Sequence, residues 1–288
     1  MKIGFIGAGK VGCSLGKYLQ GTSGDWELMG YYSRSIASAV EAAEFTGSRA
    51  YEQMEELVAA CEVLFLTTTD AAIADVWEDL CNCKECLAEK MVVHCSGSLA
   101  STIFAGAQSL HVSVASFHPL YAVADRFSSY QGMSEILFTL EGSGTKYQAF
   151  LSNLSASGLM LQEISAESKT RYHAAATVAS NLMIGLAELA FELLESSGFD
   201  RENAKFALRP LIEKNMKAVF DTDTWLALTG PAERADVGTV QKHMQQMQGE
   251  NQEIYRMLTK KIVQLAKKKH PDRDYAVVEK ILQEYKEM

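Results

Sequence analysis

The spacing of apolar residues divides the chain into two regions. Over residues 1–164, short β-rich apolar runs alternate with stretches in which apolar residues recur at helical spacing. Strands that alternate with helices are typical of right-handed crossovers, which place the strands side by side in a largely parallel sheet. The predicted strands are residues 2–6, 27–32, 63–67, 91–95, 112–117, 136–140 and 159–164.

The second region, residues 165–288, contains helical patterns and no convincing strand. Residues 173–194 predict one long helix that is apolar on nearly every face, and Pro210 should kink or break the next one. Helices are also predicted over residues 201–220, 237–248, 251–268 and 274–286. The sequence therefore predicts an α/β domain with a mostly parallel sheet, followed by an all-α domain.

Glycines mark the turn between the first predicted strand and a helix predicted over residues 11–19. In a turn of this kind the first glycine permits the tight bend, the second lets a pyrophosphate approach the backbone, and the third lets the helix pack closely. The N–H groups at the start of the helix bind the phosphates. This pattern predicts a dinucleotide site, with a structural glycine turn as the alternative. The residues of the site are Gly7, Ala8, Gly9, Lys10, Val11 and Gly12.

The end of the second predicted strand indicates which dinucleotide binds. Ser33, Arg34 and Ser35 begin 21 residues after Gly12, where a site for NAD usually carries an acidic residue. An arginine between two hydroxyl groups suits the 2′-phosphate of NADP, because the guanidinium offers a fixed charge and several donors. The alternative is that Arg34 is an ordinary exposed turn residue and Ser35 caps a helix over residues 36–45.

Composition agrees with a two-domain enzyme in the cytoplasm. The chain has 288 residues and a net charge of −9, which disfavours non-specific binding to nucleic acid. We expect no membrane partner, because no apolar run reaches the ~20 residues that a spanning helix needs. We also expect no secretion signal, because the first residues lack the pattern of a signal peptide.

The six cysteines are expected to be reduced thiols in a cytoplasm. Cys81, Cys83 and Cys86 lie close together, and a zinc site completed by Cys95 or His94 is conceivable. Their spacing is not that of paired zinc knuckles, so no metal is predicted. Whether these three cysteines have a role is left open.

Three later strands end in residues that can carry chemistry, and such ends are where ligands bind on parallel sheets. Thr67 and Thr68 are expected to border the nicotinamide ribose, while Asp70 is more simply a helix cap. The small-residue loop after the next strand is expected to face the nicotinamide, with Ser96 toward the cofactor and Ser98 toward the substrate. His118 either touches substrate or is a buried structural histidine.

Polar residues form a stripe on the long apolar helix. They are spaced by about one, two and three turns, so they share one face. Such a stripe either forms hydrogen bonds between helices or lines a substrate pocket, which we expect between the two domains. The stripe consists of Lys169, His173, Thr177, Ser180 and Asn181.

These residues suggest a mechanism for reducing a carbonyl or an imine with NADPH. Such a reduction needs a proton donor and groups that hold the substrate. Lys169 and His173 are the candidate donors, and Asn181 is placed to orient a substrate or a water. Arg209 and Arg234 can neutralise a carboxylate or phosphate, which favours a small anionic metabolite. Which metabolite, and which of the two donors acts, are left open.

Several motifs resemble a family of bacterial proteins regarded as NADP oxidoreductases, which join a Rossmann-like domain to a helical domain of unknown function. The resemblance covers nearly the whole chain and implies a homodimer formed through the helical domain, over residues 165–288. In this family one loop usually reads Arg-Gly-Asp, whereas here Ala235 takes the place of the glycine. The motifs are the glycine turn, Ser33–Ser35, Ser96–Ser98, Phe117–Pro119, Tyr172–Ala176, Ser180–Asn181, Ala207–Pro210, Thr229–Asp236, Thr239 and His243.

The layout also resembles, more distantly, the β-hydroxyacid dehydrogenases, ketopantoate reductase and pyrroline-5-carboxylate reductase. The first of these carry a catalytic Lys four residues before an Asn, whereas here His173 follows Lys169 at that spacing. Two alternatives to a carbonyl reductase therefore stay open. One is an imine reductase of the pyrroline-5-carboxylate reductase type. The other is an NADP-binding sensor or scaffold without catalytic activity.

Overall fold

The computed structural model describes residues 1–285, with the side chains of all of them except residues 84 and 85. The chain forms two compact units, residues 1–180 and residues 181–288. The sequence places the boundary at residue 164 instead. The structure assigns residues 165–180 to the first unit because helix α7 (Lys169–Ala179) begins with side chains that contact the sheet domain.

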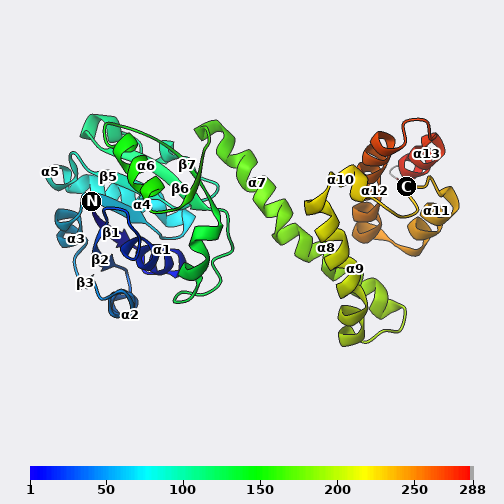
Figure 1. Ribbon diagram of the computed structural model, residues 1–288, viewed down its shortest axis with the longest axis horizontal. Coiled ribbons are helices and arrows are strands. Elements are labelled where there is room, and N and C mark those ends of the chain that lie inside the picture. The colour runs from blue at the N-terminus through cyan, green and yellow to red at the C-terminus, as the bar shows by residue number, and fades with distance from the viewer. Residues whose placement is uncertain (286–288) are drawn as a thin grey trace. The chain divides into compact units, whose positions relative to one another are not determined.

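An eight-stranded sheet forms the centre of the first unit, in the order β3-β2-β1-β4-β5-β6-β7-β8 (Figure 1). Neighbouring strands are parallel except for β6 and β7, which are antiparallel. All seven predicted strands are present. The sequence missed β3, because three residues carry too little pattern. The strands are β1 Lys2–Ile6, β2 Glu27–Tyr32, β3 Arg49–Tyr51, β4 Val63–Leu66, β5 Met91–His94, β6 Ser113–Pro119, β7 Leu137–Ser143 and β8 Met160–Glu163.

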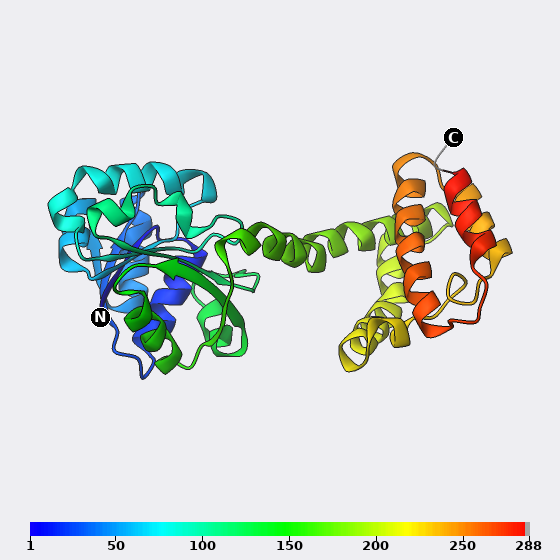
Figure 2. The same cartoon turned by 90° about the horizontal axis from the view of Figure 1, so that it is seen from above.

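Helices cover both faces of this sheet (Figure 2). Alternation along β1 sends Ile3 and Phe5 into a core with α1 and α6, and Ile6 into a second core with α3 and α4. Each face of the sheet is therefore buried within the unit itself. The helices are α1 Lys10–Gln20, α2 Ile36–Thr46, α3 Met54–Ala60, α4 Asp70–Asn82, α5 Lys84–Leu87 and α6 Tyr147–Ala156, with short 3₁₀ turns η1 Ser101–Ile103, η2 Ala107–Leu110, η3 Ser129–Glu135 and η4 Ala166–Ser168.

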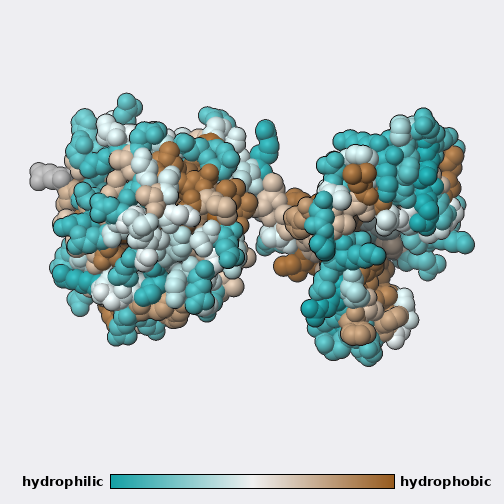
Figure 3. All heavy atoms as spheres, viewed as in Figure 1, coloured by the Kyte–Doolittle hydropathy of each residue, from teal (hydrophilic) through white to brown (hydrophobic). Residues whose placement is uncertain are grey.

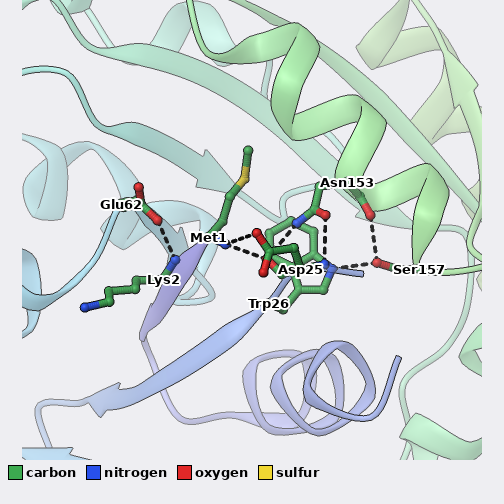
Figure 4. Close-up of polar contacts among 7 residues, drawn as sticks. All are labelled: Met1, Lys2, Asp25, Trp26, Glu62, Asn153 and Ser157. Atoms are coloured by element: carbon green, nitrogen blue, oxygen red, sulfur yellow. Dashed lines mark hydrogen bonds and ion pairs between the residues drawn. The ribbon is translucent and has the colours of Figure 1, made fainter. Parts of the chain in front are cut away.

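Polar contacts fix the amino-terminal edge of the sheet, opposite the glycine turn (Figure 4). The ammonium group of Met1 donates to the backbone carbonyl and the carboxylate of Asp25. Asn153 on α6 exchanges two hydrogen bonds with the Asp25 backbone, and the Trp26 indole donates to Ser157. These contacts hold the connection between α1 and β2 against α6.

The described residues of the second unit form helices joined by loops, with no strand. It has a small core of eight buried apolar residues, among them Val240, Val263 and Val278. The predicted long helix is divided, because Ser180 leaves helical geometry between α7 and α8. Pro210 does not end its helix, since α9 continues through it. The helices are α8 Asn181–Ser196, α9 Arg201–Asp221, α10 Thr224–Ala227, α11 Val237–Gln246, α12 Gly249–Lys269 and α13 Ala276–Glu284, and residue 286, the predicted end of the last helix, lies outside the described residues.

Large apolar side chains stay exposed along α8 and α9, and apolar atoms are visible on this part of the surface in Figure 3. Phe220, Phe206 and Ile184 are 85 %, 82 % and 72 % exposed. The expectation that no segment is apolar enough to span a membrane was wrong by the criteria of length and composition. Over Ala166–Ser196 the chain is helical, long and apolar enough to do so, with a mean hydropathy of 1.5 in its most apolar window. One such helix is weak evidence for a membrane protein.

The cysteines correct another expectation. Cys83 and Cys86 form a disulfide with their Cα atoms 5.6 Å apart, so these two are not reduced thiols. The turn between α4 and α5 brings the two residues within the distance that a disulfide requires. Cys13, Cys61, Cys81 and Cys95 are thiols. Within residues 1–285, no group of three or more potential ligands is arranged to hold a metal ion.

Candidate active site

The glycine turn has the shape of a phosphate cradle. Gly7 has a φ of +109°, which side-chain-bearing residues rarely adopt, and a Cβ there would lie 2.8 Å from the Thr67 backbone. A Cβ at Gly12 would lie 2.5 Å from the Gly7 carbonyl oxygen. Above Gly9, in contrast, a Cβ would meet nothing within 4 Å. The turn is therefore tightly packed on its inner side and open where a pyrophosphate would approach.

The start of α1 completes this cradle. Gly9 caps the helix without a side chain, and the first turn contains no acidic residue. The first N–H groups of a helix lack partners within the helix, so here they remain available to an anion. The Thr67 hydroxyl donates a 2.7 Å hydrogen bond to the Gly7 carbonyl. Thr67 thus supports the turn itself, a contact that the sequence did not indicate.

The residues predicted to bind a 2′-phosphate follow β2. Arg34 is exposed, and within residues 1–285 its side chain makes no ion pair or hydrogen bond. Ser35 caps α2, since its hydroxyl accepts the Ser38 N–H at 3.4 Å. The arginine is therefore a free cation at the edge of the cradle, while one of the two serines already has a structural role.

Asp70 organises the loop that follows β5. It is the first residue of α4, and its carboxylate accepts hydrogen bonds from the hydroxyls of Ser96 at 2.7 Å and Ser98 at 2.9 Å. The expected helix cap is not observed, because no side chain caps α4. Asp70 instead fixes both serines that the sequence assigned to cofactor and substrate.

His94, at the end of β5, contacts the same loop. Its ring is fully buried, and Nδ1 accepts the Ser96 N–H at 3.2 Å. Burial lowers the pKa of His94 to about 4, so the ring is neutral at physiological pH. The sequence considered this histidine only as a zinc ligand, and its place at a strand end was the signal for a supporting role.

Lys169 reaches this loop from α7. Only 1 % of its surface is exposed, and Nζ donates a 2.9 Å hydrogen bond to the Ser96 carbonyl oxygen. Burial lowers the pKa of Lys169 to about 8, while Glu141, Cys95 and Asp70 favour the charged form and limit the shift. An amine whose pKa lies near neutrality can exchange protons under physiological conditions.

Two histidines meet at Gly97. A Cβ on this glycine would lie 2.5 Å from His173 Nδ1 and 2.8 Å from His118 Nε2, so only glycine leaves room for both rings. His173 Nδ1 is buried without a hydrogen-bond partner. His118 Nδ1 lies 2.9 Å from the hydroxyl of Tyr172, which the sequence noted only as part of a family motif. Burial lowers the pKa of His118 to about 4, with Lys169 and His173 adding to the effect.

The other predicted site residues are found along α7 and in the second unit. The hydroxyls of Thr177 and Ser180 donate hydrogen bonds to carbonyls one turn back along the chain. Asn181, Arg209 and Arg234 belong to the second unit. Arg209 is exposed and pairs with Glu213 at 2.7 Å, and Arg234 is exposed in the loop before α11.

Comparison with protein families agrees with this architecture. Residues 1–119 match a Rossmann-like domain, and residues 136–262 match a domain of unknown function, DUF2520. The chain joins a Rossmann-like domain to a DUF2520 domain. This confirms the resemblance inferred from the sequence motifs. A search among curated proteins found no match.

Solved structures show the same arrangement of the two domains along the chain. Protein TM1727 from Thermotoga maritima is 25 % identical, with a TM-score of 0.72 over 93 % of this chain and 99 % of that one. BF3122 from Bacteroides fragilis, provisionally assigned as an NADP oxidoreductase, is 25 % identical, with a TM-score of 0.65 over 91 % and 98 % of the two chains. A pyrroline carboxylate reductase from Plasmodium falciparum, with NADP bound, is 15 % identical, with a TM-score of 0.58 over 92 % and 98 %. At that identity the likeness concerns the fold alone.

Proposed function

We propose that this protein is an NADP-dependent oxidoreductase that reduces a carbonyl group of a small anionic metabolite. The observation that carries the proposal is the presence of two features at the carboxyl ends of parallel strands in one sheet. The open glycine cradle follows β1, and the cluster around Gly97 follows β5 and β6. Ligands bind at this edge of a parallel sheet.

The cofactor would be held by the residues of the cradle and its rim. The Gly7–Gly12 turn would bind the pyrophosphate, and Arg34 with Ser33 would bind the 2′-phosphate. NADPH supplies a hydride when it is bound. Residues 1–119 match a Rossmann-like domain, and one similar solved structure is provisionally assigned as an NADP oxidoreductase. Both findings support a reductase that uses NADP.

The protein would supply the proton and hold the substrate. Lys169 and His173 are the proton donors that the sequence suggests, and both now lie at the Ser96–Ser98 loop. Loss of a general acid typically costs ~10²–10⁴ in rate, so removing the proton donor of this cluster is expected to lower turnover in that range without weakening NADPH binding. From the second unit, Arg209 and Arg234 are proposed to neutralise the anionic group and Asn181 to orient the substrate.

Cofactor choice offers the most direct test of the proposal. Charge-assisted hydrogen bonds contribute ~1.5–3 kcal/mol, so Arg34→Ala should weaken NADPH binding roughly ten- to a hundredfold and leave NADH binding nearly unchanged. Binding is measured by the fluorescence of the reduced nicotinamide. The matched control is Arg49→Ala, which removes an exposed arginine on β3 that pairs with Glu56. Equal affinity of the unaltered protein for both cofactors contradicts the proposal.

The alternative of a non-catalytic sensor makes a different prediction. A sensor would bind NADPH tightly but oxidise none in a screen of 2-oxo acids, aldehydes and cyclic imines. Oxidation of NADPH by any of these compounds, measured at 340 nm, supports the enzyme and identifies its substrate class.

We also propose a homodimer formed through residues 165–288 and a cytoplasmic location. The dimer is supported by the exposed phenylalanines and isoleucine of α8 and α9, because a monomer rarely leaves such side chains in water. A second copy of the chain is the occupant that we propose for this surface. The cytoplasmic location is proposed from the sequence, and the Cys83–Cys86 disulfide is an observation against it.

A further inference from the structure

The two histidines at Gly97 are not equivalent. His173 offers a buried Nδ1 without a partner. His118 has one such partner, since Nδ1 lies 2.9 Å from the Tyr172 hydroxyl, while Nε2 is on the side of Gly97. The two aromatic rings of this pair are nearly perpendicular, at 82°, with centroids 5.8 Å apart. Of these two histidines, only His118 therefore links the loop at Gly97 to a second group that can carry a proton, within the described residues.

The surroundings of His118 decide where its proton lies. The groups that act on its charge are Lys169 and His173 on α7, Asp70 on α4 and His94 on β5, and burial outweighs all of them. The ring is neutral at pH 7 and carries one proton. Burial raises the pKa of Tyr172, so the phenol keeps its proton and can donate it. When the phenol donates to Nδ1, the imidazole proton is on Nε2, on the side of Gly97.

We propose that His118 is the proton donor of the reduction and that Tyr172 is its positioning partner, which fixes the Nε2–H tautomer. This proposal rests on the proposed function. It assigns Lys169 to holding the Ser96 carbonyl and leaves His173 Nδ1 to contact the substrate.

The proton transfers balance without a charged histidine. As the carbonyl carbon gains the hydride of NADPH, the π electrons of the C=O bond move to oxygen. That oxygen takes the proton from His118 Nε2, and Nδ1 takes the proton of Tyr172. The imidazole ends neutral with its proton on Nδ1, and the phenolate regains a proton from water. An alkoxide is a stronger base than a phenolate, so the transfer runs downhill. Burial disfavours an imidazolium here, and this route avoids one.

The second unit contains a matched control pair. His243 Nδ1 lies 2.8 Å from the Tyr255 hydroxyl, and the two rings meet at 83°. The local geometry therefore copies that of His118 and Tyr172. Tyr255→Phe removes the same hydrogen bond as Tyr172→Phe, but at residues to which no role in the reaction is assigned.

Nitrogen NMR of the full-length protein with ¹⁵N-labelled histidine tests the tautomer without any substrate. We expect His118 to stay neutral with a protonated Nε2 between pH 5 and pH 8. Tyr172→Phe should shift His118 toward a mixture of tautomers and leave His243 unchanged, whereas Tyr255→Phe should do the reverse. A His118 that carries its proton on Nδ1 in the unaltered protein, or that titrates near 6.5, overturns the proposal.

Kinetics then test the role in the reaction, with pyruvate and 1-pyrroline as probes. Loss of a group that orients a reacting side chain typically costs ~10–100-fold, so Tyr172→Phe should lower kcat by that factor with KM nearly unchanged. Tyr255→Phe should leave both values unchanged, and an equal kcat for Tyr172→Phe and the unaltered protein contradicts the role. NADPH fluorescence on the same samples separates the two hypotheses. Failure of the unaltered protein to bind NADPH refutes the proposed function, while the NMR result still decides the tautomer.

Discussion

The two units of this protein use their apolar and polar residues in opposite ways. The first unit buries apolar side chains in two cores, one on each face of its sheet. The second has a single small core and exposes large apolar side chains on α8 and α9. The first unit therefore buries most of its apolar side chains by itself, whereas the second leaves a larger apolar surface exposed, which the proposed dimer would cover.

The two units also differ in whether their buried polar groups have partners. In the second unit Glu233 binds His270 and Arg273, and Arg256 binds Glu253 and the Leu282 carbonyl. In the first unit Lys169 contacts a carbonyl, and all four buried side-chain atoms without a partner in the described residues belong to this unit. Unsatisfied buried groups are costly, and two of these four, on His94 and His173, belong to the proposed site, so this difference supports the proposal that the first unit carries the chemistry.

The largest expected effect concerns assembly. The double variant Ile184→Glu, Phe220→Glu places two charges on the exposed apolar surface of α8 and α9. Central apolar contacts in an interface contribute ~2 kcal/mol each, so the dimer should dissociate about a thousandfold more readily. Light scattering and sedimentation velocity measure the change.

The control for this experiment lies in the other unit. Leu120→Glu, Met160→Glu changes two side chains of the first unit that are 42 % and 46 % exposed, and the dimer should persist. If the unaltered protein is a monomer at micromolar concentration, or partitions into membranes, the second copy is not what covers this surface.

A smaller effect is expected from acid, and it concerns the first unit. The pKa of His94 is about 4 in the folded state and 6.5 ordinarily. The unfolded chain therefore binds this proton first, and stability is lost as pH falls from 6.5 to 4. For a fully buried ring the loss amounts to about 3 kcal/mol.

This loss can be followed in one unit alone. Trp26 and Trp77 lie in the first unit and Trp225 lies in the second, so a Trp225→Phe background reports on the first unit. Urea unfolding at pH 7 and pH 4.5 measures the free energy of unfolding. His94→Gln should remove this part of the pH dependence, and a variant with the same acid sensitivity as its parent would show that His94 is not responsible.

The smallest effect concerns backbone strain in both units. Ala235 in the second unit and Glu89 in the first have φ values of 58° and 59°, a region that glycine adopts more readily. The left-handed conformation costs ~1–2 kcal/mol and glycine loses ~0.5–1 kcal/mol of entropy, so either residue replaced by glycine should stabilise its unit by roughly 0.5–1 kcal/mol. Thermal unfolding measures this. The control Ala227→Gly, in helix α10, should destabilise, and a loss of stability in Ala235→Gly would show that the loop carries no such strain.

The sequence by itself determined the class of fold and the place of the cradle. Alternation of strands with helices and the spacing of Gly7, Gly9 and Gly12 are local patterns, and local patterns survive folding. Lys169 and His173 were recognisable because polar residues on an apolar helix require a reason. Other predictions depended on contacts between short segments, and these predictions were wrong. The sequence missed strand β3, the disulfide between Cys83 and Cys86, and the division of the long helix.

The tertiary structure alone decided how the site is assembled. The sequence placed Asp70 and Gly97 at strand ends that share one edge of the sheet, but it did not indicate that Asp70 binds both serines or that Tyr172 contacts His118. Their pKa values and hydrogen bonds depend on burial and on neighbours distant in sequence, which periodicity cannot reveal. The sequence could locate the proposed cofactor site because a single turn forms it. The cluster around Gly97 needs side chains from several elements, which only the folded sheet brings together.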